Sequence, residues 1–491
     1  MTRPVHRVAP ATDTPVRQDS LRAHNLILTF RQIVGAPVPI SRIELAAATG
    51  LTRPTISRIV DELLTAGLVV EAEPARSGNS GRPRVGLSLA RTGPAGLGLD
   101  IRADSLSVCV VDLTGTVRHL DFAPHRVLPG HGAESGDHAA VAEPTGRHAA
   151  PSHSGAAVAD PNLGRQGVAG DEPSPGRRAV AGDEQPSPGR WTVAGDEPVA
   201  GLGRAPGRGR DLDPEDTLRS LAAMAEKAIR AAMAENLTVV GATLAVPGPV
   251  DGGMVRFAPT LGWRDVDAGG ILATLIGTDD LPVGVDNDAG LAALGELYAG
   301  GPELRDFVCV SGEFDIGAGL VLGGVPLRGS RGWGGELGHV MVDSAGPACA
   351  CGASGCLQCY AGLQRIIDAA PDLPSSPQQP AVAIDTLVSN GSPEILAALN
   401  RAASALGIAV SALVNLVNVD TVLLGGSYSL LTSWLTDGID RELRSRVLTT
   451  RWSPIEVRPS LLGPDAAVIG AALQAIDQVR RDPNPWLARR G

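Results

Sequence analysis

The feature that most constrains the fold of this chain is a group of cysteines close to a single histidine. Residues 335–359 read GELGHVMVDSAGPACACGASGCLQC, in which Cys349, Cys351 and Cys356 are spaced C-x-C-x4-C. The glycines in this run let the backbone wrap closely around an ion. A tetrahedral zinc needs four nitrogen or sulfur donors, and His339 completes a Cys3His set. We therefore predict a structural zinc site that ties these four positions together.

Two questions about this cluster stay open in the sequence. The chain has nine histidines, yet His339 is the only one after residue 153, which favours a specific role. The alternative is a turn that carries reduced cytosolic thiols. Cys359 either replaces one of the ligands or packs as a small apolar residue. Because four protein donors leave no position for water, the predicted zinc is structural and not catalytic.

The distribution of charge separates a basic head from an acidic body. The 491 residues have a net charge of −11. Residues 1–90 contain 11 arginines against 7 acidic residues, a local charge of +4, so the remainder carries −15. This pattern suits contact with nucleic acid at one end only. The length allows roughly three domains.

The apolar runs are those of a protein without a membrane span. No stretch approaches ~18 uninterrupted apolar residues, and the N-terminus (MTRPVHRVAPATDTPVRQD) lacks the apolar core of a signal peptide. We therefore predict a soluble, cytoplasmic protein with no membrane partner. Cys109 and Cys309 lie in strand-like runs, SVCVVDL and FVCVSG, and are predicted to be buried core residues.

The head, residues 21–90, has the order of elements of a winged helix-turn-helix. Apolar spacing predicts a helix over 21–34 and a short helix over 41–49 capped by Ser41. A third helix follows from a Thr52 cap and ends near residue 67. The hairpin formed by LVVEAEP and RPRVGLSLA then supplies the wing.

The polar face of the third helix and the tip of the wing are the predicted DNA-binding surface. Short hydrogen-bonding and cationic side chains there suit base edges and phosphates in a major groove. Two wing arginines suit phosphates or a minor groove. The predicted DNA-binding residues are Arg53, Thr55, Ser57, Arg58, Arg82 and Arg84. The alternative is a small helical dimerisation module with a solvated polar face.

Two segments are predicted to be disordered: residues 1–20 and a low-complexity insertion at 128–213. The insertion is rich in Gly, Pro, Ala and Ser, and VAGDE recurs in it at 168, 180 and 193. Such a composition cannot bury enough apolar surface to offset chain entropy. The body therefore comprises residues 93–127 and 214–480.

The body alternates strands and helices, which predicts an α/β fold. An amphipathic helix over 214–234 is followed by the apolar strand LTVVGATLAVPG. Further apolar strands are expected near 283–286, 306–311 and 420–424, and a closing helix near 466–479.

Five short motifs in a fixed order connect the body to a known family. They are GLDIRADSLSVCVVDLTG, VPGPVDGGMV, VDNDAG, GELGH with the cysteine cluster, and LLGGS. Together with the winged head they resemble the ROK family of sugar-responsive repressors and sugar kinases, in its transcriptional-regulator branch. The resemblance implies an actin-like (ribonuclease H-like), two-lobed sugar kinase fold in the body. The match covers nearly everything except the insertion.

The resemblance also implies a sugar site. In the kinases of the family, the aspartate at the position of Asp288 is the general base on the sugar hydroxyl, and its neighbour Asn287 holds hydroxyls in place. Glu336 and His339 are implied as sugar contacts, with the imidazole shared between zinc and ligand. Two positions depart from the family pattern while keeping hydrogen-bonding capacity, Thr260 for asparagine and Gln358 for glutamate. The implied sugar-binding residues are Gly248, Thr260, Asn287, Asp288, Glu336, His339 and Gln358.

The phosphate loops depart from the kinases more severely. The family's kinases begin the first loop with Asp-x-Gly-Gly-Thr-Lys, whereas this chain has Asp-Ile-Arg-Ala-Asp from residue 100, which lacks the lysine and adds Asp104. In the second loop, Asp315 stands where glycine is usual and is expected to add bulk and negative charge against a polyphosphate. We therefore expect no ATP turnover, and no catalytic residue unless Asp288 serves a kinase.

The leading hypothesis is a sugar-responsive regulator of carbohydrate genes, with repression as the expected mode. Its partners would be double-stranded operator DNA, a sugar or sugar-phosphate effector, and further copies of itself in a homodimer or homotetramer. The alternative is an ATP-dependent hexose kinase with a DNA-binding head. A third reading is a regulator whose body has lost small-molecule control and serves only for dimerisation.

Overall fold

The computed structural model describes residues 18–72, 85–125, 212–277, 281–370 and 380–490. The predicted disorder of residues 1–20 and 128–213 lies mostly outside the described residues, as does the predicted wing tip with Arg82 and Arg84. It is wrong at the described ends, because residues 18–20 belong to α1, Leu212 N donates to Leu261 O, and Asp213 caps α4. The first helix begins at Gln18 rather than at the predicted residue 21.

The head is a winged helix-turn-helix, as the sequence predicts. Ser41 caps α2 through a capping box with Glu44, and Thr52 caps α3 by accepting from the backbone of Thr55. Gly50 ends α2 in the left-handed conformation. The elements of the head are α1 (Gln18–Val34), β1 (Ile40–Ser41), α2 (Arg42–Thr49), α3 (Arg53–Thr65), β2 (Val69–Ala72) and β3 (Gly86–Leu89), with strand order β1-β3-β2.

The body consists of two lobes, each built on a five-stranded sheet. The lobe 1 strands, in the order β11-β7-β4-β5-β6, are β4 (Gly93–Ile101), β5 (Ser105–Asp112), β6 (Val117–Pro124), β7 (Leu237–Val246) and β11 (Val283–Asn287). The lobe 2 strands, in the order β14-β13-β12-β15-β16, are β12 (Phe307–Gly312), β13 (Ile316–Leu322), β14 (Val325–Pro326), β15 (Thr421–Gly426) and β16 (Glu456–Pro459).

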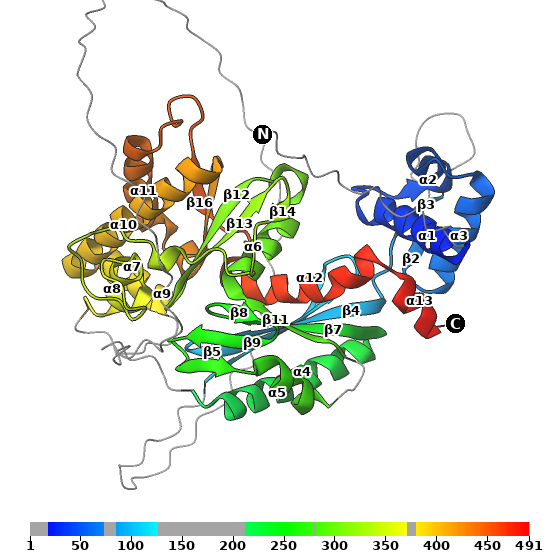
Figure 1. The fold of residues 1–491 in the computed structure, drawn as a ribbon, viewed down its shortest axis with the longest axis horizontal. Coiled ribbons are helices and arrows are strands. Elements are labelled where there is room, and N and C mark those ends of the chain that lie inside the picture. Colours follow the sequence, from blue (N-terminus) through cyan, green and yellow to red (C-terminus); the bar gives the residue numbers. More distant parts are fainter. Residues whose placement is uncertain (1–17, 73–84, 126–211, 278–280, 371–379, 491) are drawn as a thin grey trace, which may run out of the picture. The chain divides into compact units, whose positions relative to one another are not determined.

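The two sheets repeat one topology. In each, the first three strands in sequence pair antiparallel, and two later strands add in parallel beside the first. Such parallel additions need crossover connections, which the helices supply. This repeat of a mixed sheet with helices is the predicted two-lobed actin-like architecture (Figure 1).

Helices cover both sheets, and two of them connect the lobes. Lobe 1 carries α4 (Pro214–Ala234), α5 (Ala268–Ile276) and a small sheet of β8 (Val250–Asp251), β9 (Met254–Ala258) and β10 (Trp263–Val266). Lobe 2 carries α7 (Gln358–Ala361), α8 (Leu363–Ile367), α9 (Pro380–Ser389), α10 (Pro393–Val417) and α11 (Thr432–Arg446). The connecting helices are α6 (Asp288–Ala299) and α12 (Ala466–Arg481), followed by α13 (Asn484–Arg490). Short 3-10 turns are η1 (Gly301–Glu303), η2 (Leu337–His339), η3 (Ser427–Ser429) and η4 (Gly463–Asp465).

Two core details agree with the sequence. Cys109 and Cys309 are fully buried, as predicted. In the described part of the chain, one helix, α10, is long and apolar enough to cross a membrane, but 61% of its apolar window is buried inside the protein. That burial is typical of a core helix.

Helix α12 packs backbone to backbone against its neighbours. A Cβ added at Gly470 would lie 1.8 Å from the carbonyl oxygen of Leu291 in α6, and one added at Gly98 would lie 2.0 Å from that of Val468. Only glycine permits such close contact. Helices α6 and α12 therefore lie directly against each other (Figure 1), and α12 lies against β4.

The C-terminal helix α13 lies beyond the predicted end of the body at residue 480. Its Trp486 is 4% exposed and packs in a core cluster shared by the head, α12 and β5. The indole Nε1 donates a hydrogen bond of 2.9 Å to the carbonyl oxygen of Ala66, the residue that ends α3. The chain end is thus tied to the C-terminus of the third helix of the head.

Candidate functional site

A pocket of about 330 Å³ lies between segments of the two lobes. Of the predicted sugar-binding residues, six line it: Gly248, Asn287, Asp288, Glu336, His339 and Gln358. Its volume is in the range of pockets that bind small molecules. Gly248 has φ 83°, and an added Cβ would lie 2.1 Å from the carbonyl oxygen of Phe257, so this position requires glycine.

The Asn287–Asp288 pair joins β11 to α6 at the edge of the pocket. Asn287 caps α6, because its Oδ1 accepts from Gly290 N at 3.0 Å, and its Nδ2 donates to Gly248 O at 3.1 Å. Asp288 Oδ1 accepts from Ala289 N at 2.7 Å. The pair is therefore a helix cap and a part of the pocket wall at once.

The pocket has acidic groups that raise one another's pKa. Burial raises the pKa of Asp288 well above its usual range, and nearby carboxylates raise it further, with Asp100 first among them. Burial also raises the pKa of Glu336, and the charge of Asp315 adds to that shift. Burial raises the pKa of Asp315 to about 6, against a hydrogen bond from Thr260 that lowers it.

Asp315 lines the pocket together with Asn287 and Asp288. Its expected effect on a polyphosphate stays a prediction. Its Oδ2 accepts a hydrogen bond of 2.5 Å from Thr260 Oγ1. Thr260, a predicted sugar contact, is not among the lining residues and reaches the pocket through this bond.

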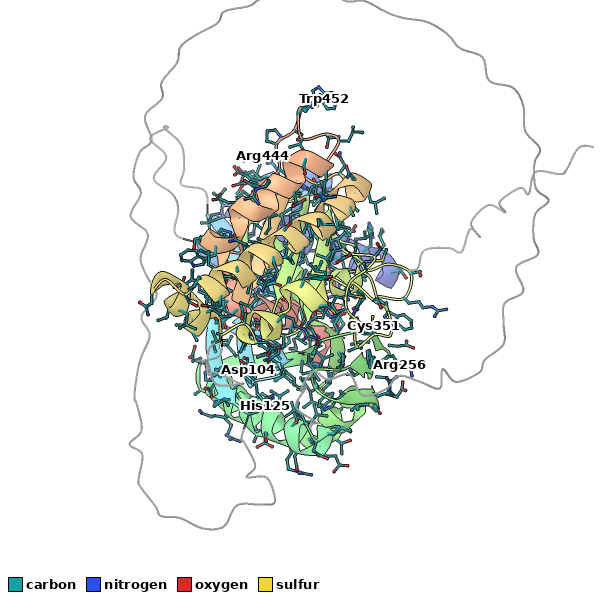
Figure 2. The ribbon with its side chains drawn as sticks, turned by 90° about the vertical axis from the view of Figure 1, so that its left-hand side faces the viewer. Asp104, His125, Arg256, Cys351, Arg444 and Trp452 are labelled. Carbon is teal, nitrogen blue, oxygen red and sulfur yellow. The ribbon has the colours of Figure 1, made fainter. Side chains whose placement is uncertain are left out.

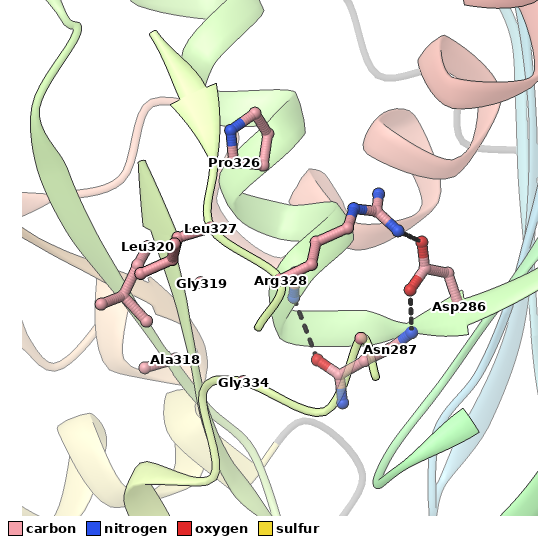
Figure 3. Close-up of a pocket in the computed structure, with 11 residues that line it drawn as sticks. Asp286, Asn287, Ala318, Gly319, Leu320, Pro326, Leu327, Arg328 and Gly334 are labelled. Atoms are coloured by element: carbon pink, nitrogen blue, oxygen red, sulfur yellow. Dashed lines mark hydrogen bonds and ion pairs between the residues drawn. The ribbon is translucent and has the colours of Figure 1, made fainter. Parts of the chain in front are cut away.

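A second, smaller cavity lies behind Asn287 (Figure 3). With about 20 Å³ it holds roughly one water molecule and not a ligand. Beside it, Asp286 pairs with Arg328 and its Oδ2 accepts from Gln474 Nε2 of α12 at 3.0 Å. Asp286 Oδ1 also accepts from Asn287 N at 2.9 Å. These bonds connect the pocket-lining Asn287 to α12.

The predicted metal ligands come together. The donor atoms of His339, Cys349, Cys351 and Cys356 all lie within 4.8 Å of one another. His339 Nδ1 is 3.7 Å from Cys349 Sγ, and the Sγ atoms of Cys351 and Cys356 are 3.7 Å apart. Tetrahedral zinc–thiolate bonds of ~2.3 Å place sulfur atoms at about this separation. The set fits a tetrahedral metal ion.

Cys359 stands outside this set of four. Its Sγ lies 3.7 Å from the carbonyl oxygen of Ala348, on the loop that carries the ligands. His339 and Cys351 (Figure 2) also line the 330 Å³ pocket. The metal cluster and the pocket therefore share part of one wall.

The two predicted phosphate loops are joined by an ion-pair network. Arg102, in the turn between β4 and β5, donates from Nε to Asp100 Oδ2 at 2.8 Å and from Nη2 to the carbonyl oxygen of Pro464. Its Nη1 lies 3.6 Å from Glu313 Oε1 in the turn between β12 and β13. Ser427 Oγ of the LLGGS motif donates to Glu313 Oε2 at 2.8 Å. Arg102 and Glu313 were not singled out from the sequence, because their partners lie far away in the chain.

Of the predicted DNA-binding residues, the structure describes four, all on α3. Its apolar side, including Ile56 and Leu63, is buried in the head. Arg53 and Arg58 are exposed, and among the described residues neither forms an ion pair. Thr55 and Ser57 are half-buried on the same helix. The helix therefore offers two guanidinium groups to a partner.

Comparison with known proteins decides the family. The model of the ROK family matches residues 210–478, more than half of the chain. The chain belongs to the ROK family. A model of the MarR family matches residues 26–82, the winged head. This domain combination is that of the transcriptional regulators within the ROK family, and so confirms the prediction from the sequence motifs.

The relatives of this ROK protein include repressors. It is 31% identical over 285 residues to a putative xylose repressor of Caldicellulosiruptor sp., covering 55% of this chain and 71% of the relative. It is 24% identical over 442 residues to the xylose repressor of Bacillus spizizenii, covering 89% and 91%. A solved ROK family transcriptional regulator, a homologue of the E. coli MLC protein, has a TM-score of 0.64 at 22% identity and covers 96% of this chain and 99% of the other. That likeness shows the fold.

Proposed function

We propose that this ROK protein is a sugar-responsive transcriptional repressor of carbohydrate genes. Its winged heads bind operator DNA, and a sugar bound in the 330 Å³ pocket weakens that binding. The observation that carries the proposal is the presence, in one chain, of a winged helix with exposed arginines and a pocket lined by Asn287, Asp288 and Glu336. The relatives named xylose repressor support it.

The phosphate loops support a binding role for the body without ATP turnover. Kinases of this fold need small residues there so that backbone amides can approach phosphate. Here Arg102 and Glu313 draw the two loops together instead. A polyphosphate would have to break that network and would meet the carboxylates of Asp100 and Glu313.

We further propose that His339, Cys349, Cys351 and Cys356 hold a structural zinc ion. Three thiolates and an imidazole are the donors that zinc prefers, and all four positions would be filled by protein. The ion would fix the loop that carries Glu336 and His339 at the pocket. The ion would have a structural role only.

We propose that the protein acts in the cytoplasm as a dimer or a tetramer. Operators of helix-turn-helix proteins usually contain two half-sites, which a pair of heads reads together. A sugar can shift such an assembly only if it binds one conformation more tightly than another. Residues of both lobes line the pocket. Closure of the lobes on a bound sugar would therefore distinguish the two conformations.

The hexose kinase is the second candidate, because Asp288 lies in the pocket as a kinase base would. The test is ADP release by the purified protein with Mg-ATP and a panel of hexoses, N-acetylhexosamines and pentoses. We expect no turnover with any of them. Sugar-dependent ADP release that disappears in Asp288→Asn would contradict the proposal of a repressor without enzymatic activity. It would show that the protein is a kinase.

A further inference from the structure

Gln358 holds the loop between β12 and β13 with both of its polar atoms. Its Oε1 accepts from Ile316 N at 2.9 Å, and its Nε2 donates to the carbonyl oxygen of Phe314. The two bonds grip the backbone on either side of Asp315. A glutamate could accept from Ile316 N but could not donate to Phe314 O. The carboxamide is therefore matched to the loop and not primarily to a ligand.

Asp315 lies between these two bonds and faces the pocket. Its Oδ2 is occupied by the hydroxyl of Thr260, which comes from lobe 1, whereas Asp315 belongs to lobe 2. Among the residues that the structure describes, its Oδ1 has no hydrogen-bond partner. One oxygen thus fixes the side chain, and the other is left for a ligand.

The charge of the pocket selects among ligands. Three carboxylates line it, those of Asp288, Asp315 and Glu336, and none of the lining residues is lysine or arginine. A phosphate group on a sugar would meet negative charge without a countercharge. A sugar hydroxyl or ammonium group would instead donate hydrogen bonds to these carboxylates.

We propose that Asp315 is the specificity-determining residue of the effector pocket and that Gln358 is its positioning residue. Together they select an unphosphorylated sugar with a hydroxyl or amino group that donates to Asp315 Oδ1. This inference rests on the proposed function, because it names the ligand class of the same pocket. In this protein the carboxylate that contacts the sugar would therefore come from position 315. In the family it usually comes from the glutamate at position 358.

The test is calorimetric titration of the full-length protein, without DNA, with D-glucose, D-xylose, D-glucosamine and D-glucose 6-phosphate. We expect at least one unphosphorylated sugar to bind at least tenfold more tightly than the phosphate ester. Asp315→Asn should weaken binding of the tightest-binding sugar at least tenfold. It should also reduce the ratio between the affinity for that sugar and the affinity for glucose 6-phosphate. Asp251→Asn, on the surface of lobe 1 and outside the pocket, is the matched control and should bind like the wild type.

The role of Gln358 is tested in a double-mutant cycle. Gln358→Glu should weaken sugar binding about tenfold in the wild type but less than about twofold in the Asp315→Asn background, because it acts through Asp315. Independent, additive losses would overturn the positioning role. Melting curves of each variant confirm that it is folded.

The titration separates the failure of this inference from the failure of the proposed function. Tighter binding of glucose 6-phosphate, unchanged binding by Asp315→Asn, or binding of none of the sugars would overturn the inference. Because the titration contains no DNA, sugar binding that leaves operator affinity unchanged would count against the repressor alone and would leave the role of Asp315 standing.

Discussion

At the scale of single residues, Arg102 does most to separate this protein from a kinase. The side chain of Arg102 is 16% exposed, and that of its partner Asp100 is 1% exposed. Removal of one member of such a pair leaves the others buried without countercharge. Arg102 therefore stabilises the contact between the two loops that a bound nucleotide would have to separate.

Arg102→Ala should lower the free energy of unfolding by about 3 kcal/mol, because Asp100 and Glu313 lose their shared cation. Urea denaturation followed by tryptophan fluorescence measures this. Arg219→Ala, which removes exposed ion pairs on α4 to Glu215 and Asp216, is the control and should cost under about 1 kcal/mol. An equal loss of unfolding free energy in both variants would show that the Arg102 network stabilises the protein no more than a surface ion pair does.

The raised pKa of Asp315 predicts a pH dependence of stability. Burial raises this pKa from 3.8 to about 6 in the folded protein. The native state then binds the proton more tightly than the unfolded state, so this group costs stability as the pH rises from about 4 through about 6. Asp315→Asn removes the charge and keeps an acceptor for Thr260. It should be more stable than the wild type by about 2 kcal/mol at pH 7.5, and by less at pH 5. An advantage that is independent of pH, or a loss at pH 7.5, would contradict the assignment.

At the scale of elements, local signals in the sequence predicted the head well. Ser41 and Glu44 are three residues apart, and Thr52 stands next to its helix, so their caps are visible without tertiary structure. The cluster of cysteines was predictable for the same reason. Helix α13 was missed, because its seven residues have no clear period and depend on contact with the head.

Contacts between distant residues were the part that the sequence could not show. Gln358 lines the pocket, and its contact to a sugar hydroxyl stays a prediction, but its bond to a loop that lies about 40 positions earlier in the chain could not be seen in the sequence. Asp315 belongs to the predicted second phosphate loop, in the turn between β12 and β13, but the sequence did not show that its side chain lines the pocket. Arg102 and Pro464 meet only because α12 returns to lobe 1.

Helix α3 carries the expected contact to DNA. Arg58→Ala should weaken operator binding about tenfold and leave the melting temperature of the body unchanged, because Arg58 is exposed and forms no ion pair within the described part of the chain. Fluorescence anisotropy with a labelled duplex at fixed salt measures this. Arg230→Ala, an exposed arginine on α4 of the body, changes the net charge equally and should bind as the wild type does. Undiminished binding by Arg58→Ala would refute the placement of the recognition helix.

The loop from residue 339 to 356 depends on the proposed zinc. Beyond the short turn η2, it forms no helix and no extended strand, and turn hydrogen bonds and two isolated bridges, Met341 with Cys356 and Ala348 with Ser354, hold its shape. Chelation should therefore lower the melting temperature, and added zinc should restore it. Metal analysis of the purified protein should find one zinc per chain. A protein that contains no zinc and melts identically with and without chelator would rule out the site.

At the scale of the whole molecule, α12 connects the pocket to the head through a series of hydrogen bonds. Gln474 of α12 bonds to Asp286, which bonds to the pocket residue Asn287. The chain continues into α13, where Trp486 bonds to Ala66 at the end of α3. Close packing at glycines on two sides of α12 makes this helix the route that we propose for the coupling between pocket and head. This route requires a measurement of coupling and not of contact alone.

Trp486→Phe should reduce the coupling between sugar and DNA about three- to tenfold while leaving sugar affinity unchanged, because it removes the indole N–H that bonds to Ala66 and lies far from the pocket lining. The measurement is the ratio of DNA affinities with and without saturating sugar. Trp434→Phe removes a comparable indole bond, to Asp385 within lobe 2, and should leave the ratio as it is in the wild type. Unchanged coupling in Trp486→Phe would exclude this route.

The most direct test of the proposed repressor is one titration. The tightest-binding duplex, recovered from a random-sequence pool, is titrated with the protein in the presence of each sugar of the panel, with and without Mg-ATP. We predict that at least one unphosphorylated sugar weakens DNA binding tenfold or more, and that Mg-ATP leaves this effect unchanged. DNA affinity that no sugar changes, or an effect that requires ATP and releases ADP, would contradict the proposal.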